Sequence, residues 1–336
     1  MATPLDTVTQ RPLQEALAKF DAGTRLSFRQ ISLLAQHARA TGDMGFYVTI
    51  FARIDPELRP HFEQNSHAAV FLRSSGKAAG NINVFRKLRY SSLRGPVTAF
   101  EKIYRSNGAD LRRLQWVYRN LYGQLPCPMP EMLEIVHGKR LSVVLFAFER
   151  FRAISAEGLI ETLRAMHRFS CAQPATAFDR IEPAMMRMPK LYQNMRAALI
   201  GQLHLAGVAE DDLAQVERSC MDAGSVFNHG DLHRFNVGQT GMIYDWDTAC
   251  FAPAALDLGR GLAALTPLTD IAVLHGVIRS QFGYDPAQDR TEVARILFFY
   301  LVYATQKLRK EVDPRPDQIA TLRAIFKDIR AAFAQG

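Results

Sequence analysis

Short stretches in the first half of the chain have the two-residue period or the compact apolar run of a β-strand. A loop of small residues at 74–81 and a turn at 91–95 separate the first three of them. The pattern therefore predicts strands at 69–72, 84–90, 97–104, 132–136 and 142–148.

The rest of the chain carries the three-to-four-residue apolar spacing of helices. This spacing is present before the sheet, between its third and fourth strands, and after it, in the stretches 12–20, 28–38, 46–54, 109–121 and 159–167. The predicted fold class is α+β, with a helical extension at 1–66, a strand-rich part at 67–148 and a larger helical part at 149–336. A structural role, a dimer surface and a contact with substrate are all open for the extension.

Composition is that of a soluble, cytoplasmic protein. The 336 residues are 48% hydrophobic, enough for about two domains. The chain begins without a basic and then apolar signal pattern, and its longest apolar run, 296–304, is too short to cross a bilayer. We therefore expect no membrane partner. The four cysteines lack the spacing of metal or disulfide sites, which suits a reducing compartment: Cys127, Cys171, Cys220 and Cys250.

The net charge of +8 arises from 41 basic and 33 acidic side chains. The basic residues are distributed rather than gathered in a stripe with aromatic residues, and no nucleic-acid recognition motif is present. We therefore expect solvated basic helix faces and no nucleic-acid partner. The oligomeric state is open.

The segment from His229 to Asn236 reads His-Gly-Asp-Leu-His-Arg-Phe-Asn, and Ile-Tyr-Asp-Trp-Asp follows at 243–247. Phosphoryl transfer needs a carboxylate that orients or deprotonates the attacking hydroxyl, together with oxygen ligands that hold Mg²⁺ against the phosphates. Asp231, Asn236 and Asp245 supply these groups in order. A turn through 237–241 between two short strands, the second ending at Asp245, would bring Asn236 close to Asp245.

These two motifs resemble the catalytic and metal-binding loops of the aminoglycoside phosphotransferase/choline kinase superfamily, the protein-kinase-like small-molecule kinases. The resemblance implies a two-lobe fold, with a small lobe at 67–148 built on a five-stranded antiparallel sheet and a larger helical lobe at 149–336. It implies Asp231 as catalytic base and Asn236 and Asp245 as Mg²⁺ ligands. It also implies that His229 supports the loop backbone and that Asp257 braces the loop. The alternative is a solvated turn rich in Asp and His, which two linked motifs in the correct order disfavour.

The resemblance further implies ATP as the phosphoryl donor, bound by the small lobe. The loop at 76–83 offers backbone N–H groups at Gly76 and Gly80 and side-chain donors at Asn81 and Asn83. Taken alone, such a glycine pair is more often an ordinary hairpin turn. The base would lie at 147–149, beside Phe148, although Phe146 and Phe148 are more often core residues than platforms for adenine.

Lys102 occupies the position of the strand lysine that pairs with the α- and β-phosphates in kinases. Strand alternation places it on the face opposite Glu101. The alternative is an exposed lysine. The family usually pairs this lysine with a Glu on the next helix, but 109–121 contains none, and neither Asp110 nor Gln115 is a firm substitute.

The acceptor is expected to be a small molecule with a hydroxyl group, recognised by the helical regions 172–226 and 258–334. Sugars, amino alcohols and choline-like alcohols all fit, whereas the positive net charge disfavours a polycationic aminoglycoside. Three other readings remain open. A protein kinase is disfavoured by Gly230 and by the missing Ala-Pro-Glu segment; a nucleotide-binding pseudokinase is favoured by the missing helix Glu; the third is a helical interaction module.

Overall fold

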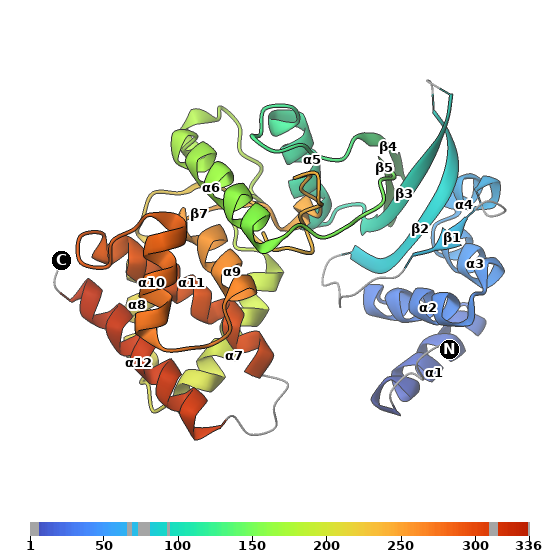
Figure 1. Cartoon of the computed structure of the whole chain (residues 1–336). Coiled ribbons are helices and arrows are strands. Elements are labelled where there is room, and N and C mark those ends of the chain that lie inside the picture. The colour runs from blue at the N-terminus through green and yellow to red at the C-terminus, as the bar shows by residue number, and fades with distance from the viewer. Residues whose placement is uncertain (1–6, 66–68, 73–80, 93–94, 309–314, 335–336) are drawn as a thin grey trace. The chain divides into compact units, whose positions relative to one another are not determined.

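The computed structural model describes residues 7–65, 69–72, 81–92, 95–308 and 315–334. The chain forms two compact units, which are coloured along the sequence in Figure 1. Residues 1–112 and 130–150 make the first, here called the sheet unit. Residues 113–129 and 151–336 make the second and larger one, here called the helical unit.

A five-stranded antiparallel sheet forms the sheet unit, in the order β1-β2-β3-β5-β4. The strands span Val70–Phe71, Asn81–Ser92, Gly95–Arg105, Met132–His137 and Leu141–Ala147. This sheet confirms the strands predicted from the periodicity. The strand bounds differ from the predicted ones by up to three residues. β1 has only two residues, and β2 begins three residues earlier than predicted, with an irregular register between Ile82 and Arg86.

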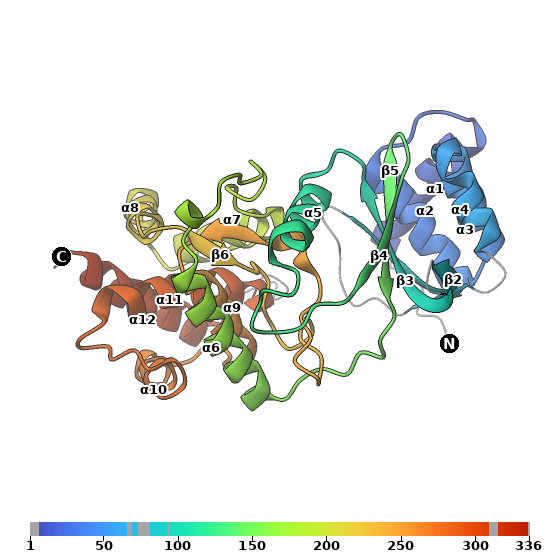
Figure 2. The same cartoon turned by 90° about the horizontal axis from the view of Figure 1, so that it is seen from above.

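Helices α1 (Thr7–Asp21), α2 (Phe28–Thr41), α3 (Met44–Ile54) and α4 (Arg59–Gln64) cover one face of this sheet, as Figure 2 shows. Their apolar faces and the inward residues of the strands share one core, which includes Leu34, Phe51 and Phe62 from the helices and Ile82, Ile103 and Val143 from the sheet. A sheet face that carries so much apolar surface must be covered. Helices α1 to α4 provide that cover, so residues 7–64 belong to the same core as the sheet.

Glu101 of β3 lies at the centre of a buried ionic network on this covered face. Arg86 of β2 donates to both of its carboxylate oxygens, from Nε at 2.7 Å and from Nη2 at 2.6 Å. His61 Nε2 of α4 lies 2.7 Å from Oε2, and the Tyr47 hydroxyl of α3 donates to Oε1 at 3.3 Å. The Arg86 guanidinium also lies over the rings of Tyr47 and Phe62. Buried charges need such partners, and the network supplies them for both ions.

Asp55, between α3 and the short helix η1 (Pro56–Leu58), fixes the turn between β4 and β5. Its carboxylate accepts hydrogen bonds from the backbone N–H groups of Lys139, Arg140 and Leu141, at 3.1, 2.7 and 2.9 Å. The side chain is almost fully buried. The extension therefore holds the sheet both at its centre, through Glu101, and at this turn.

The helical unit packs its helices around the apolar helix α11 (Arg290–Leu308), which contacts α7, α8, α9 and α12. Residues 296–304 of α11, the longest apolar run of the chain, are all buried. Helix α5 begins in the sheet unit and ends in this one. The helices are α5 (Ala109–Leu121), α6 (Ala156–Ala172), α7 (Lys190–Leu205), α8 (Glu210–Met221), α9 (Ala255–Leu265), α10 (Ile271–Phe282), α11 and α12 (Pro316–Phe333), with short turns η2 (Ala175–Ala177) and η3 (Trp246–Thr248).

The α+β fold class is thus confirmed, with a small antiparallel sheet and a larger helical part. The predicted helices are present. Helix α5 has the predicted bounds, and the other four extend by up to five residues at one or both ends, as helix ends are the least defined part of such a prediction. Over the described ranges, no helix is both long enough and apolar enough to span a membrane.

Candidate active site

The segment from His229 to Asn236 follows the short strand β6 (Val226–Asn228) of the helical unit. It is called the catalytic loop below, after the role that the resemblance predicts for it. Strand β6 pairs with β7 (Cys250–Ala252), which follows the second motif. Gly230 has φ +81°, and a Cβ at this position would lie 2.2 Å from the backbone oxygen of Thr248. Only glycine fits both this conformation and this close approach, so the loop geometry depends on Gly230.

Three buried groups hold the backbone of this loop. The Asp257 carboxylate of α9 accepts hydrogen bonds from the N–H groups of His229, at 2.7 Å, and Gly230, at 2.9 Å. The Tyr303 hydroxyl of α11 donates to the carbonyl oxygen of Gly230 at 2.9 Å. His229 Nε2 lies 2.8 Å from the carbonyl oxygen of Tyr244, next to Asp245. Asp257 and His229 therefore make the supporting contacts that the resemblance implied.

Asp231 is held by side chains on both of its carboxylate oxygens. Arg260 of α9 donates from Nε to Oδ1 at 2.7 Å, while His233 Nε2 lies 3.5 Å from Oδ2. Burial alone would raise the pKa of the Asp231 carboxyl, but the Arg260 guanidinium and then His233 outweigh it and hold that pKa well below its ordinary range. Asp231 is therefore a carboxylate at neutral pH, with a fixed orientation.

Asn236 and Asp245 lie on adjacent segments of the chain. Tyr244 N–H donates to the carbonyl oxygen of Asn236 at 2.8 Å, and Val237 bridges to Ile243. The Gly238 N–H donates to the carbonyl oxygen of Met242 at 2.8 Å, so the predicted hairpin is present, with one bridge in place of two regular strands. Outside the hairpin, Ile243 N–H donates to the oxygen of Pro128, and Gln239 N–H to that of Arg152. Asp245 itself has φ 66°, a left-handed conformation that is uncommon outside glycine.

Lys102 lies in β3 of the sheet unit, where only 4% of its surface is exposed. Its Nζ is 5.3 Å from the ring centroid of Tyr104, while Glu101 turns to the helices on the other face. The strand alternation predicted that Lys102 and Glu101 lie on opposite faces of the sheet. The alternative prediction, that Lys102 is exposed on its strand, is wrong.

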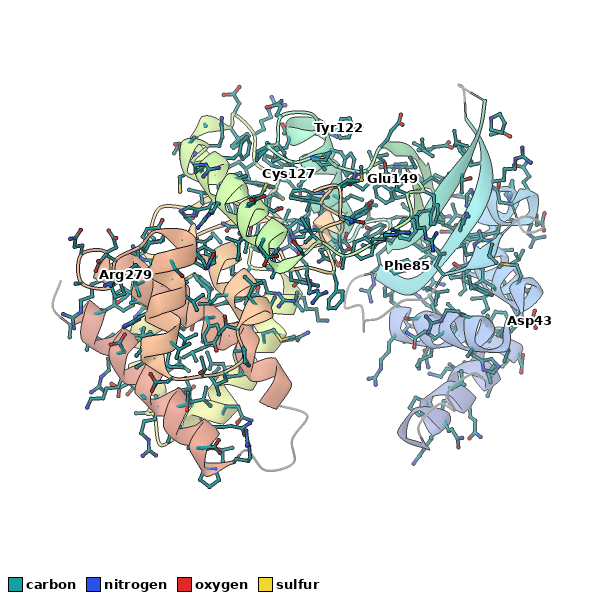
Figure 3. The ribbon with its side chains drawn as sticks, viewed as in Figure 1. Asp43, Phe85, Tyr122, Cys127, Glu149 and Arg279 are labelled. Carbon is teal, nitrogen blue, oxygen red and sulfur yellow. The ribbon has the colours of Figure 1, made fainter. Side chains whose placement is uncertain are left out.

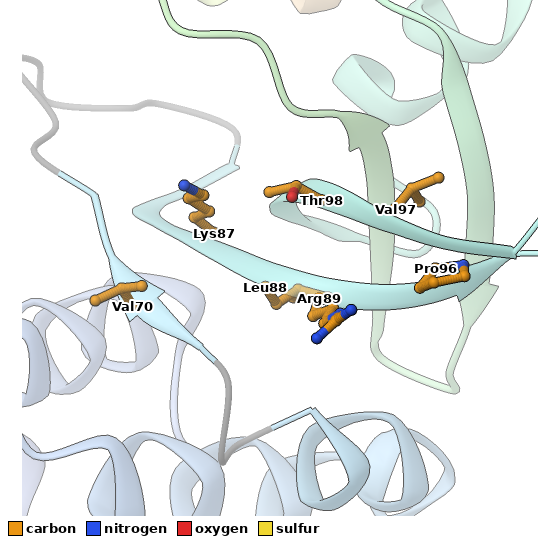
Figure 4. A pocket seen from close by; sticks show the side chains of 7 residues that line it. All are labelled: Val70, Lys87, Leu88, Arg89, Pro96, Val97 and Thr98. Atoms are coloured by element: carbon orange, nitrogen blue, oxygen red, sulfur yellow. The ribbon is translucent and has the colours of Figure 1, made fainter.

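The strand that would border the base ends near Phe148. The N–H of Phe148 donates to the carbonyl oxygen of Thr98 at 2.8 Å, and Lys87 Nζ lies 4.7 Å from its ring centroid. A pocket of ≈390 Å³ lies along the β2–β3 hairpin beside these residues, and Figure 4 shows the side chains that line it: Val70, Lys87, Leu88, Arg89, Pro96, Val97 and Thr98. Gly76 and Gly80 lie outside the described residues, as do the side chains of Asn81 and Asn83.

Two further groups at the catalytic loop, Arg260 and Tyr303, were not assigned to it from the sequence. Arg260 follows Asp257 by three residues on α9, so both lie on one helix face. That spacing could have indicated its place at the loop. Tyr303 lies 73 residues from its partner Gly230, and no local pattern relates the two.

A sequence model described as the phosphotransferase enzyme family matches residues 102–292, more than half of the chain. No curated protein matches the chain. Among solved structures, choline kinase from Cryptosporidium parvum is similar at 10% identity and a TM-score of 0.45, covering 87% of this chain and 96% of that one.

Two aminoglycoside phosphotransferases are also similar. The one from Alicyclobacillus acidocaldarius has 14% identity and a TM-score of 0.39, with 79% of this chain and 91% of that one covered. The one from Streptomyces rimosus, in complex with ADP and streptomycin, has 14% identity and a TM-score of 0.35, with 75% and 92% covered. Structural likenesses this weak do not bear on activity.

Proposed function

The chain belongs to the phosphotransferase enzyme family, and we propose that it transfers the γ-phosphoryl group of ATP to a hydroxyl group of a small molecule. The observation that carries the proposal is the held carboxylate of Asp231 in a loop braced by Asp257. A phosphotransferase of this kind works chiefly by alignment and charge neutralisation, and both need such a rigid loop.

We assign Asp231 the role of binding and orienting the acceptor hydroxyl. Its carboxylate accepts a hydrogen bond from the acceptor hydroxyl and orients the oxygen toward the γ-phosphorus. Because the pKa of Asp231 is held low by Arg260 against the effect of burial, it is a weak base. Orientation therefore comes first, and proton transfer follows late, as suits the loose transition state of phosphoryl transfer.

Asn236 and Asp245 are the residues that we assign to Mg²⁺. The amide nitrogen of Asn236 donates to the backbone oxygen of Asp231 at 3.0 Å, which leaves the amide oxygen as its ligand atom. An amide oxygen and a carboxylate are donors that suit Mg²⁺, which takes its other ligands from water and phosphates. Over the part of the chain that is described, no cluster of three His, Cys, Asp or Glu residues offers an all-protein metal site. Mg²⁺, when bound, neutralises charge on the phosphates.

The nucleotide is assigned to the sheet unit, with Lys102 on the phosphates. The loop residues Gly76, Gly80, Asn81 and Asn83 complete the phosphate contacts in this proposal, and Phe148 borders the base. The family usually has a Glu for Lys102 on the next helix, whereas α5 carries no Glu and has Asp110 in its first turn. This departure favours the second candidate, a nucleotide-binding pseudokinase with a regulatory or scaffold role.

Mg²⁺-dependent ATP consumption by the full chain separates these candidates. The acceptors to supply are choline, ethanolamine, a set of sugars and streptomycin, with Asp231→Asn as the matched control. Consumption that one acceptor stimulates, and that the variant loses, supports the kinase and gives its acceptor class. Nucleotide binding in a thermal shift, without turnover for any acceptor, supports the pseudokinase. Stimulation that persists in Asp231→Asn contradicts the assignment of the base.

A further inference from the structure

Arg260 and Asp257 act on the catalytic loop from one face of α9. Asp257 binds the loop backbone, and Arg260 binds the side chain of Asp231 through a 2.7 Å hydrogen bond from Nε to Oδ1. The side chain of Arg260 is 16% exposed and that of Asp231 is 14% exposed. Hydrogen bonds between ions in such a partly buried place are short and strong, so this contact restricts the rotation of the Asp231 carboxylate.

Arg260 is itself held by α11. Its guanidinium lies 5.0 Å from the ring centroid of Tyr303, whose hydroxyl donates to Gly230 of the catalytic loop. The two helices approach closely at Gly259, where a Cβ would lie 2.5 Å from the Cβ of Phe299 and 2.7 Å from the backbone nitrogen of Tyr300. Gly259 therefore permits the packing that places Arg260 between Tyr303 and Asp231.

The two oxygens of Asp231 are bound unequally. Oδ1 has the short contact to Arg260, whereas the contacts of Oδ2 are longer, 3.5 Å to His233 and 3.4 Å to the amide nitrogen of Asn236. An oxygen with long contacts exchanges them for a closer donor more readily than one held in a short ionic bond. Oδ2 is therefore the oxygen suited to receive an acceptor hydroxyl.

We propose that Arg260 is a positioning residue, which fixes the Asp231 carboxylate through Oδ1 and so directs Oδ2 to the acceptor. This rests on the proposed function. In the transfer step the acceptor oxygen forms a bond to the γ-phosphorus, and the bond from that phosphorus to the β–γ bridging oxygen breaks. The acceptor proton passes to Oδ2 of Asp231, and ADP leaves with the bond's electron pair.

The experiment compares Arg260→Ala, Arg260→Lys and the unchanged chain, with the acceptor that gives the highest turnover in the panel above. Loss of the guanidinium lets the carboxylate rotate, and kcat of Arg260→Ala should fall by about 100-fold, the effect of a small misplacement of a reacting group. KM for ATP should stay within about twofold, since Arg260 does not bind the nucleotide. Millimolar methylguanidinium should restore part of kcat in Arg260→Ala, and Arg260→Lys should retain intermediate activity.

Arg279→Ala is the matched control. Arg279 lies on the outer side of α10, where Figure 3 labels it, and its side chain is 61% exposed. Its kcat should equal that of the unchanged chain, with no response to methylguanidinium. Thermal unfolding of each variant shows whether it is folded. If Arg260→Ala does not fold, the kcat of Arg260→Lys is compared with that of the unchanged chain instead.

Two outcomes overturn the inference in distinguishable ways. An unchanged chain without turnover contradicts the proposed function, and the role of Arg260 falls with it. An active unchanged chain, together with a folded Arg260→Ala whose kcat is unchanged or whose loss methylguanidinium leaves unaffected, contradicts the positioning role alone.

Discussion

His61 of α4 lies 2.7 Å, from Nε2 to Oε2, from Glu101 of β3, and so joins the N-terminal helices to the strand that carries Lys102. The same carboxylate takes both hydrogen bonds from Arg86. Of the three roles open for residues 1–66, these contacts and those of Asp55 support the structural one. The helices complete the core of the sheet unit.

Replacing Glu101 by Gln should therefore destabilise the sheet unit. The change leaves the Arg86 guanidinium buried without its counter-charge, and breaking one side of a buried ion pair costs roughly 3–5 kcal/mol. Urea unfolding gives the loss in free energy. Glu57→Gln is the control, because Glu57 is exposed and a surface change should stay within about 0.5 kcal/mol. Equal stability of the two variants would contradict the role of the network.

The lowered pKa of Glu101 predicts how the stability of the sheet unit depends on pH. Burial raises the pKa of Glu101, but the charge of Arg86 and the hydrogen bonds from His61 and Arg86 outweigh it and lower that pKa from 4.5 to about 2. A carboxyl with a lowered folded-state pKa contributes stability that is present above its unfolded value and lost as the pH falls toward the folded one. Between pH 4.5 and 2, about 3 kcal/mol should be lost through Glu101.

Denaturant midpoints measured from pH 6 down to pH 2 follow this loss. In Glu101→Gln the decline over the same interval should be shallower, because residue 101 no longer titrates. If Glu101→Gln loses stability as steeply as the unchanged chain, carboxyl groups other than that of Glu101 cause the loss of stability at low pH.

Gly230→Ala should abolish most turnover. An added Cβ meets the backbone oxygen of Thr248 at 2.2 Å, and φ of +81° is unfavourable for alanine, so the loop must move. A displacement of the order of 1 Å is enough to lower kcat by about 100-fold. Gly241→Ala is a close control, since its φ is +80° but nothing lies within 4 Å of the added Cβ. If both variants keep the same kcat, the close approach at Gly230 has no part in catalysis.

The strands and helices, which follow from the period of apolar residues, could be predicted, whereas the contacts between distant segments could not. The two-residue period predicted the strands and the opposite faces of Glu101 and Lys102. The partners of Glu101 lie 15, 40 and 54 residues away, at Arg86, His61 and Tyr47. No local pattern specifies such pairs, because burial and the packing of separate elements decide them.

In the catalytic loop, too, the residue types could be predicted from the sequence and the contacts with distant segments could not. The order of its carboxylates and amide was visible in the sequence, since the chemistry fixes those residue types at that spacing. The predicted hairpin forms with a single bridge in place of two strands. The N–H groups of Gln239 and Ile243 donate to Arg152 and Pro128, contacts that no local pattern specifies. Arg260 lies 29 residues from Asp231, and the packing of α9 on α11 determines its place.

Asp245→Asn should remove metal-dependent turnover while leaving the fold intact. Asp245 has φ 66°, a conformation that asparagine tolerates better than alanine does, so this change removes the charge with little backbone strain. Losing a carboxylate ligand weakens the hold on Mg²⁺, and turnover should need much higher Mg²⁺ concentrations or vanish. A Mg²⁺ titration of ATP consumption measures this, with thermal unfolding to check the fold. Asp222→Asn, at an exposed position, is the control. An unshifted Mg²⁺ dependence in folded Asp245→Asn would exclude Asp245 as a ligand and leave the metal site to be sought elsewhere.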